Sequence, residues 1–282
     1  MGHTAEVVTL ADLVGALVAD AEEALQAHKD GMPRGPVLGL PDLDNTLGGC
    51  LAPGLHGLTG DPGSGKTALA LQAAAHCRFP ALYVTAEQAP MELFRRLIAQ
   101  TTEVPMDELR YALPDRIRRL AEETAGQVPM LALLDAGRGP ASREQIGGLL
   151  LSLRERWRFR SALLVVDALQ PWARGAYEGD EYPALQEGLR DLVLVTSQTN
   201  TAALVLSHRN RESTRRKTGP VGSMTAAKGS ADFEHLAETV LHLERVEGSA
   251  GVTVHLAKNR RGPAGFSTGL QFNRSTQRFT EE

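Results

Sequence analysis

The chain has 282 residues, of which 42% are hydrophobic and 23% charged, a composition typical of soluble globular proteins. Its formal net charge of −4 excludes a surface that coats itself with nucleic acid, although a local basic segment remains compatible with that charge. The N-terminus does not read as a secretion signal, and no apolar run is long enough to span a bilayer. We therefore expect a cytoplasmic protein without a membrane partner. Cys50 and Cys77 lack metal-ligand spacing and are expected to be apolar fillers.

Residues 9–28 are predicted to form one amphipathic helix. Thr9 is suited to the N-cap, with Asp12 three residues later, and one stripe of the helix is apolar: Leu10, Leu13, Val14, Leu17, Ala21 and Leu25. A connector rich in glycine and proline follows over residues 28–36. The helix either folds back on its own domain or docks on a neighbouring subunit. We expect residues 1–37 to be this helix with its connector, and residues 38–282 to be a separate domain.

From Leu40 onward, apolar strand-like runs alternate with helical stretches, which favours parallel strands joined by crossover helices. The predicted strands are 54–59, 80–85, 130–135, 161–167 and 201–207, and the predicted helices are 65–77, 89–100, 114–125, 141–157 and 182–199. Residues 209–222 are expected to be a loop. The runs 238–246, 251–258 and 266–272 alternate in the manner of antiparallel edge strands. The sequence therefore predicts an α/β fold with a mostly parallel sheet covered by helices on both faces.

Residues 60–67 fit the phosphate-binding pattern G-x-x-x-x-G-K-[ST] between a predicted strand and a predicted helix. The glycines let consecutive backbone N–H groups turn toward a phosphate at the start of the helix. Lys66 would place a charge on the outer phosphates, and the Thr67 hydroxyl could ligate Mg²⁺. The predicted nucleoside triphosphate site comprises Gly60, Asp61, Pro62, Gly63, Ser64, Gly65, Lys66, Thr67 and Ala68. A chance glycine turn is disfavoured because both flanking elements are of the right type.

Three predicted strands end in polar side chains. Asp167 follows an uninterrupted apolar run and is expected to hold Mg²⁺, directly or through water. Glu87 ends another strand and is placed to activate a water beside the γ-phosphate, although a solvated carboxylate is the rival interpretation. His208 could contact the γ-phosphate or be an ordinary loop histidine, and the residues alone favour neither.

Two basic segments could contact phosphates. The stretch after the fifth predicted strand is rich in arginine, lysine and glycine, and it carries Arg215, Arg216 and Lys217 before Lys228. It suits the backbone of single-stranded DNA, without aromatic residues for base stacking, but a solvated loop is the common alternative. Lys258 and Arg260 end a predicted strand before Gly262-Pro263. A strand holds cations rigidly, which suits an arginine finger, whereas a surface turn is the simpler interpretation.

The ordered set of motifs resembles the RecA-fold ATPase domain of DnaB-type replicative helicases over about residues 9–279. Its quoted parts are the P-loop, the strand ending in Glu87, Asp167-Ala168-Leu169-Gln170, Ser207-His208-Arg209-Asn210-Arg211, Lys228-Gly229-Ser230 and Lys258-Asn259-Arg260-Arg261-Gly262-Pro263. The resemblance implies Mg²⁺ and ATP at Lys66, Thr67 and Asp167, with Glu87 as the catalytic base. It also implies that Lys258 and Arg260 act on a neighbour's nucleotide, that the N-terminal helix packs on the adjacent subunit, and that single-stranded DNA passes through a ring, expected to be a hexamer.

The sequence also departs from that family. It shows no counterpart of the collar domain that recruits primase, so we expect a plasmid, phage or accessory replication system, with no loader or primase identified. His208 stands where the family usually has glutamine, and Ala227-Lys228 replaces the usual Arg-Glu pair. The leading hypothesis is an ATP-driven ring motor on single-stranded DNA. The alternative is a RecA-fold ATPase switch resembling KaiC or RadA, which assembles but does not unwind DNA.

Overall fold

The computed structural model describes residues 7–178, 180–208 and 230–281, with side chains also left undescribed at 208 and 230–232. The chain divides into two units, Met1–Arg34 and Gly35–Glu282, and each is considered by itself. Among the described helices, none combines the length and the apolar character needed to cross a bilayer.

Helix α1 (Leu10–Lys29) makes up most of the described part of the first unit. The predicted N-cap is confirmed. The Asp12 N–H donates to Thr9 Oγ1 (3.3 Å), and the Thr9 N–H donates to Asp12 Oδ2 (2.9 Å), which completes a reciprocal capping box. No residue of α1 is buried, and its apolar stripe is exposed, with Leu10 at 85% and Leu17 at 69%. The helix therefore presents an apolar face that its own unit does not cover.

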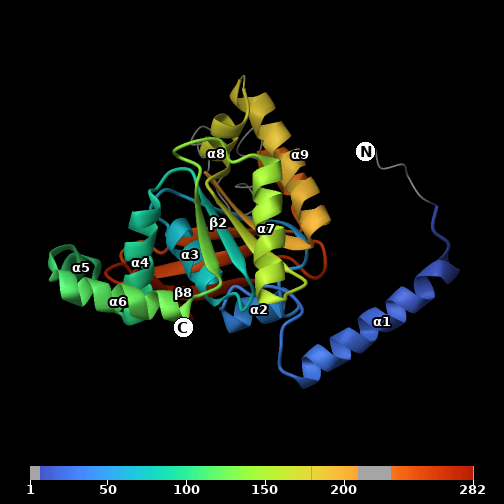
Figure 1. The fold of residues 1–282 in the computed structure, drawn as a ribbon, viewed down its shortest axis with the longest axis horizontal. Coiled ribbons are helices and arrows are strands. Elements are labelled where there is room, and N and C mark those ends of the chain that lie inside the picture. Colours follow the sequence, from blue (N-terminus) through green and yellow to red (C-terminus); the bar gives the residue numbers. More distant parts are fainter. Residues whose placement is uncertain (1–6, 179, 209–229, 282) are drawn as a thin grey trace. The chain divides into compact units, whose positions relative to one another are not determined.

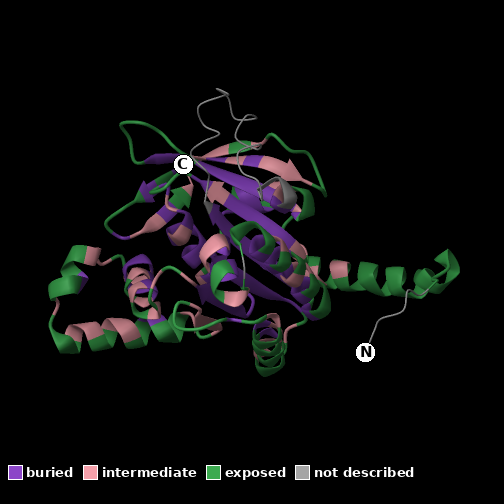
Figure 2. Ribbon diagram, turned by 90° about the horizontal axis from the view of Figure 1, so that it is seen from above, coloured by how far each residue is buried: buried purple, intermediate pink, exposed green. Residues whose placement is uncertain are grey.

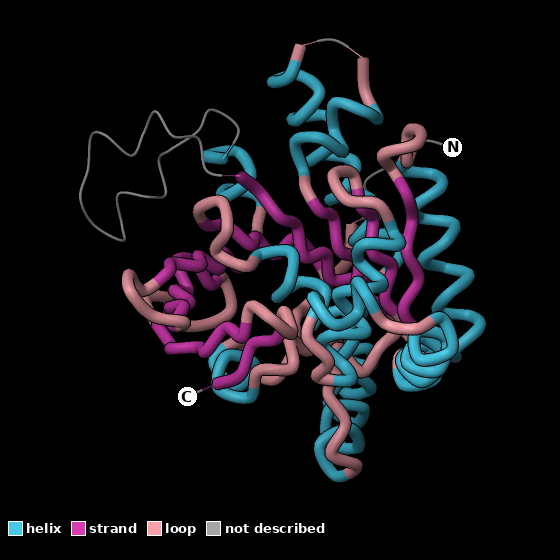
Figure 3. Tube along the Cα trace, turned by 90° about the vertical axis from the view of Figure 1, so that its left-hand side faces the viewer, coloured by secondary structure: helices cyan, strands magenta, loops and turns pink. Residues whose placement is uncertain are grey.

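The second unit is built on a nine-stranded sheet in the order β3-β2-β4-β5-β1-β6-β7-β8-β9 (Figures 1 and 3). The first six strands in this order are parallel, and the last three add antiparallel pairs. The strands are β1 (Gly54–Gly60), β2 (Ala81–Thr85), β3 (Leu131–Asp135), β4 (Ala162–Asp167), β5 (Thr201–His208), β6 (Thr239–Arg245), β7 (Gly251–Asn259), β8 (Ser267–Asn273) and β9 (Arg278–Glu281). This arrangement confirms the α/β fold with a mostly parallel sheet and antiparallel C-terminal strands.

One predicted strand direction was wrong in part. β6 was expected to be antiparallel, but it runs parallel to β1, with Thr59 opposite His242, and is antiparallel only to β7. Alternating hydrophobicity reports which face of a strand is buried and carries no information on its direction. The connection from β5 to β6 is long enough for a crossover, which a parallel pairing requires.

Two apolar clusters, one on each face of the sheet, form the core (Figure 2). The first joins the sheet to α3 (Lys66–His76) and α4 (Pro90–Thr102), and the second joins it to α7 (Arg143–Trp157), α8 (Leu169–Ala176), α9 (Glu181–Thr199) and α10 (Ser230–Leu236). A small third cluster packs α4 against α5 (Met106–Tyr111) and α6 (Pro114–Gln127). Short α2 (Pro41–Thr46), α5, α8, α10 and β9 have no counterpart among the predicted elements. Cys77 is a buried filler, as expected, and burial raises the pKa of its thiol to about 12.

Candidate nucleotide-binding site

The loop between β1 and α3 has the backbone of a phosphate cradle. Gly63 and Gly65 have φ angles of +78° and +96°, which L side chains rarely adopt, and Gly65 is the N-cap of α3. A Cβ atom on Gly60 would lie 2.6 Å from the Leu243 carbonyl oxygen, and one on Gly65 would lie 2.6 Å from Cζ of Phe279. Any larger residue at these two positions would clash, so the loop needs glycine for both conformation and space.

Lys66 begins α3 and is only 7% exposed. Its Nζ donates to the carbonyl oxygens of Gly60 (2.8 Å) and Asp61 (3.1 Å). Burial lowers the pKa of Lys66, and the carboxylates of Asp167, Asp61 and Glu87 oppose that shift. Next to it, the buried Ser64 hydroxyl has no hydrogen-bond partner among the described residues. A buried ammonium and an unsatisfied hydroxyl in one loop are the groups that a phosphate ligand would engage.

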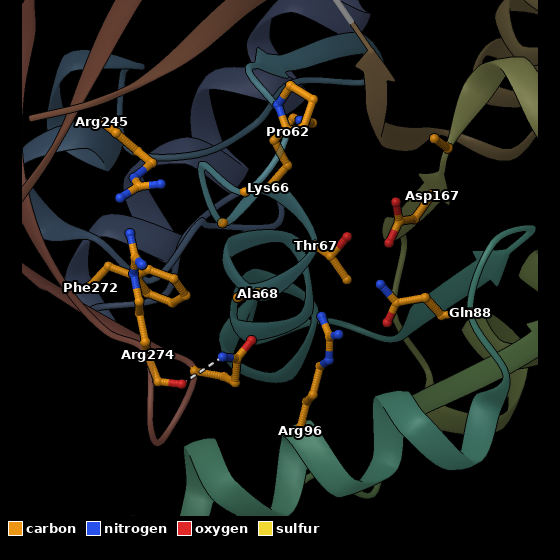
Figure 4. A pocket seen from close by; sticks show the side chains of 14 residues that line it. Pro62, Lys66, Thr67, Ala68, Gln88, Arg96, Asp167, Arg245, Phe272 and Arg274 are labelled. Atoms are coloured by element: carbon orange, nitrogen blue, oxygen red, sulfur yellow. Dashed lines mark hydrogen bonds between the residues drawn. The ribbon is translucent and has the colours of Figure 1, made fainter. Parts of the chain in front are cut away.

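A cavity of about 470 Å³ opens beside this loop (Figure 4). Thr67 lies on one side of it and Asp167 on the other, with the carboxylate of Asp167 pointing into the space between them. The residues that line it also include Pro62, Gly63, Gly65, Lys66, Ala68, Gln88, Arg96, Ala168, Arg245, Phe272, Arg274 and Gln277. The hydroxyl of Thr67 and the carboxylate of Asp167 are hard oxygen donors of the type that Mg²⁺ prefers, so this pair fits the expected ion.

Asp167 ends β4 and is 3% exposed. The Tyr83 hydroxyl of the neighbouring strand β2 donates to its Oδ2 over 2.6 Å. Complete burial raises the pKa of Tyr83 well above its ordinary value, and the charge of Asp167 adds to that shift. Tyr83 therefore stays a donor and orients the carboxylate. Sequence reasoning missed Tyr83, whose only signal was one polar atom in an otherwise apolar strand.

The structure places Glu87 on the segment after β2, whose last residue, Thr85, lies opposite Asp167. Glu87 is exposed, and its charge acts to raise the pKa of Lys66. Of the two consecutive residues Glu87 and Gln88, it is Gln88 that lines the cavity. The catalytic role of Glu87 thus stays a prediction, whereas Gln88 is a cavity residue that the sequence did not indicate.

The end of β5 lies directly beside the cradle. Ser207 and His208 are in register with Thr59 and Gly60 of β1, and the Ser207 hydroxyl accepts a hydrogen bond from Gln170 Nε2 (2.8 Å). The His208 side chain falls outside the described atoms, so its role stays a prediction. Arg215, Arg216, Lys217 and Lys228, the expected DNA contacts, also lie outside the described residues.

Three arginines around the cavity were not predicted. Arg96 comes from α4, Arg245 from the end of β6 and Arg274 from the turn between β8 and β9 (Figure 4). They are far apart in sequence and come together only through the sheet order, so no local pattern could have indicated them. Their charges, added to that of Lys66, suit a polyanionic ligand.

Lys258 and Arg260 are not near this cavity. Lys258 lies in β7 opposite Val240, and the Arg260 N–H donates to the Glu238 carbonyl (2.9 Å) just before β6 begins. This is the N-terminal end of β6 and of its parallel neighbour β1, whereas the P-loop follows the C-terminal end of β1. The two cations and the P-loop of one chain therefore lie at opposite ends of the sheet.

Comparison with known proteins agrees with this geometry. The family described as the DnaB-like helicase C terminal domain matches residues 35–281. The chain is 29% identical over 287 residues to replicative DNA helicase DnaB of Treponema pallidum (strain Nichols), covering 96% of this chain and 61% of that protein. It is 26% identical over 246 residues to DNA repair protein RadA of Mycobacterium tuberculosis (strain ATCC 25618 / H37Rv), covering 86% of this chain and 42% of that protein.

Among solved structures, a DnaB-like replicative helicase, described with its interactions with primase, superposes with a TM-score of 0.77 at 20% identity, and covers 95% of this chain and 68% of that one. A separate ATPase domain superposes with a TM-score of 0.80 at 21% identity, and covers 96% of this chain and 98% of that one. At these identities the likeness shows the fold, which is RecA-like. The chain spans about three fifths of the DnaB relative and less than half of the RadA relative. Since the family match extends over nearly all of the second unit, the chain belongs to the DnaB-like helicase C-terminal domain family.

Proposed function

We propose that this chain is the ATP-hydrolysing motor of a ring that acts on single-stranded DNA. The observation that carries the proposal is the pairing of a complete P-loop with a buried carboxylate across one cavity, in a chain of this family. The finger cations Lys258 and Arg260 lie at the far end of the sheet, which supports active sites completed between subunits. The replication system in which the motor works stays a prediction.

The residues around the cavity divide the work. Lys66 and the backbone N–H groups of the loop would hold the β- and γ-phosphates. Thr67 and Asp167 would hold Mg²⁺, which when bound neutralises charge on those phosphates. Tyr83 keeps Asp167 ionised and oriented by donating to one of its oxygens. Arg245 and Arg274 line the opposite wall of the cavity and would contact the rest of the nucleotide.

Hydrolysis needs a group that deprotonates the attacking water. We assign this role to Glu87, because its segment joins β2 to α4 at the carboxyl edge of the sheet, where Asp167 also lies. We assign the sensing of the γ-phosphate to His208, since β5 brings it level with Gly60.

Assembly into a ring, which we propose to be a hexamer, would cover two surfaces at once. The exposed apolar stripe of α1 would pack on an adjacent subunit, and Arg260 with Lys258 would reach that subunit's nucleotide. The residues Arg215, Arg216, Lys217 and Lys228 would contact the DNA backbone. The alternative, an ATPase switch without unwinding, shares the fold and draws support from the similarity to RadA.

The test is the ATPase rate with and without single-stranded DNA, measured together with the mass of the assembly. The motor predicts a ring whose turnover rises with DNA, and Lys66→Ala should abolish both rates because the outer phosphates lose the P-loop cation. A ring whose turnover is indifferent to DNA, even when Arg215, Arg216 and Lys217 are intact, would favour the switch. A monomer with full turnover would contradict both.

A further inference from the structure

The terminal nitrogens of both finger cations are engaged by their own chain. Lys258 Nζ donates to the carbonyl oxygens of Glu234 and His235, the latter over 3.2 Å. Arg260 Nη2 also donates to the His235 carbonyl. These carbonyls belong to the last turn of α10, where helix carbonyls lack intrahelical partners and carry partial negative charge. The end of α10 is thus a natural acceptor for cations.

Glu238 adds a full negative charge beside these carbonyls. Its Oε1 lies 3.5 Å from Arg260 Nη1, and its Oε2 lies 3.6 Å from Arg261 Nε. Its side chain is 21% exposed, compared with 48% for that of Arg260. We call the carbonyls of Glu234 and His235 together with the Glu238 carboxylate the finger dock.

The dock is fixed to the core. Phe233 of α10 is 1% exposed and packs over Gly57, where a Cβ atom would lie 2.8 Å from its ring. The Glu238 N–H donates to the Leu55 carbonyl (2.7 Å), which ties the segment after α10 to β1. The acceptors therefore stay in place when a neighbouring subunit arrives, and only the cationic side chains can move.

We propose that the finger dock is an autoinhibitory contact, which holds Arg260 and Lys258 in their own subunit until a neighbour's triphosphate draws them away. The inference rests on the proposed function, because it takes Arg260 to be the finger. A guanidinium uses Nη1 and Nη2 to bind a phosphate, and these are the two nitrogens that the dock occupies. Dock and neighbour's phosphate therefore compete for the same atoms, and basal hydrolysis includes the cost of release.

Glu238→Gln tests this competition, since it removes the charge and keeps the shape of the side chain. The kcat of the assembled ring should rise roughly two- to fivefold, the range that partly exposed ion pairs contribute. The KM for ATP should stay unchanged, because the P-loop lies at the other end of the sheet. Glu244→Gln is the matched control, a carboxylate on the same β6 strand that pairs with His255 instead. Its kcat should equal that of the wild type.

A rise in kcat cannot come from a damaged fold, and Glu238→Ala should change it in the same direction. In the background of Arg260→Ala, Glu238→Gln should have no further effect. If Arg260→Ala abolishes turnover while both Glu238 variants leave kcat unchanged or lower it, the dock is overturned and the finger stands. If Arg260→Ala keeps full turnover, the finger assignment fails, and the dock fails with it.

Discussion

Asp167 depends on a neighbour that the sequence did not reveal. The carboxylate is buried at the end of β4, and the Tyr83 hydroxyl holds it over 2.6 Å from the adjacent strand. Groups that orient a metal ligand from behind commonly change metal affinity by 10- to 100-fold, roughly. Tyr83→Phe should therefore raise the Mg²⁺ concentration at half-maximal ATPase by about tenfold. The matched control is Tyr111→Phe, which alters an exposed tyrosine on α5. An unchanged Mg²⁺ dependence in Tyr83→Phe would show that Asp167 does not hold the ion.

Glu87→Gln should separate nucleotide binding from hydrolysis. The amide has the size of the carboxylate but cannot accept a proton from water, so kcat should fall by roughly 10²-fold or more, with ATP affinity retained. Single-turnover kinetics with a binding titration would measure both quantities. Glu92→Gln, which alters an exposed pairing on α4, should leave them unchanged. Near-normal turnover in Glu87→Gln would place the base elsewhere.

His56 makes the folded protein sensitive to acid. It lies inside β1, where Nε2 donates to the Ala52 carbonyl (2.7 Å) and Nδ1 accepts from Thr239 (2.8 Å) when the ring is neutral. Burial lowers its pKa from 6.5 to about 4. The unfolded chain binds this proton below pH 6.5 and the folded chain only near pH 4, so stability falls as pH drops through that window, by about 3 kcal/mol. Urea unfolding should show a weaker pH dependence in His56→Gln, and equal slopes would rule out this group.

At the scale of elements, α1 is the clearest case of a surface that awaits a partner. The predicted helix and its capping box are confirmed, and its apolar stripe is exposed. Leu17→Glu should weaken assembly without lowering the melting temperature of the second unit, because the stripe contributes nothing to that core. Analytical ultracentrifugation would measure the assembly, and Glu23→Gln on the opposite face of the helix is the control. An unchanged assembly mass for Leu17→Glu would remove α1 from the subunit interface.

Long elements with strong periodicity were predictable from the sequence, and short or relational features were not. The first five strands and the five longer helices of the second unit lie within a few residues of their predicted bounds. Their hydrophobic patterns are local, so neighbouring residues suffice to identify them. The direction of β6 depends on which strand it pairs with, and α2, α5 and β9 are too short to carry a period. The same limit separates the P-loop, a contiguous motif, from Tyr83, Arg245 and Arg274, which only the fold brings to the cavity.

For the whole molecule, the central feature is the separation of two halves of one active site. Lys66 begins α3 at the C-terminal end of β1, and Arg260 lies beyond the N-terminal end of the same strand. A chain with this arrangement cannot bring its own finger to its own nucleotide. Hydrolysis in this account is therefore a property of the assembly, and each cavity needs the Arg260 of another copy.

Mixing two inactive variants tests that claim most directly. Lys66→Ala lacks the P-loop cation and keeps the finger, whereas Arg260→Ala keeps the P-loop and lacks the finger. In an equal mixture, half the P-loops are intact and half of these meet an intact finger, so roughly a quarter of the wild-type ATPase should return. Each variant alone should hydrolyse ATP at least about 10³-fold more slowly than the wild type. If mixed rings form, as native mass spectrometry would show, and remain as inactive as either parent, the two residues do not act across a subunit boundary.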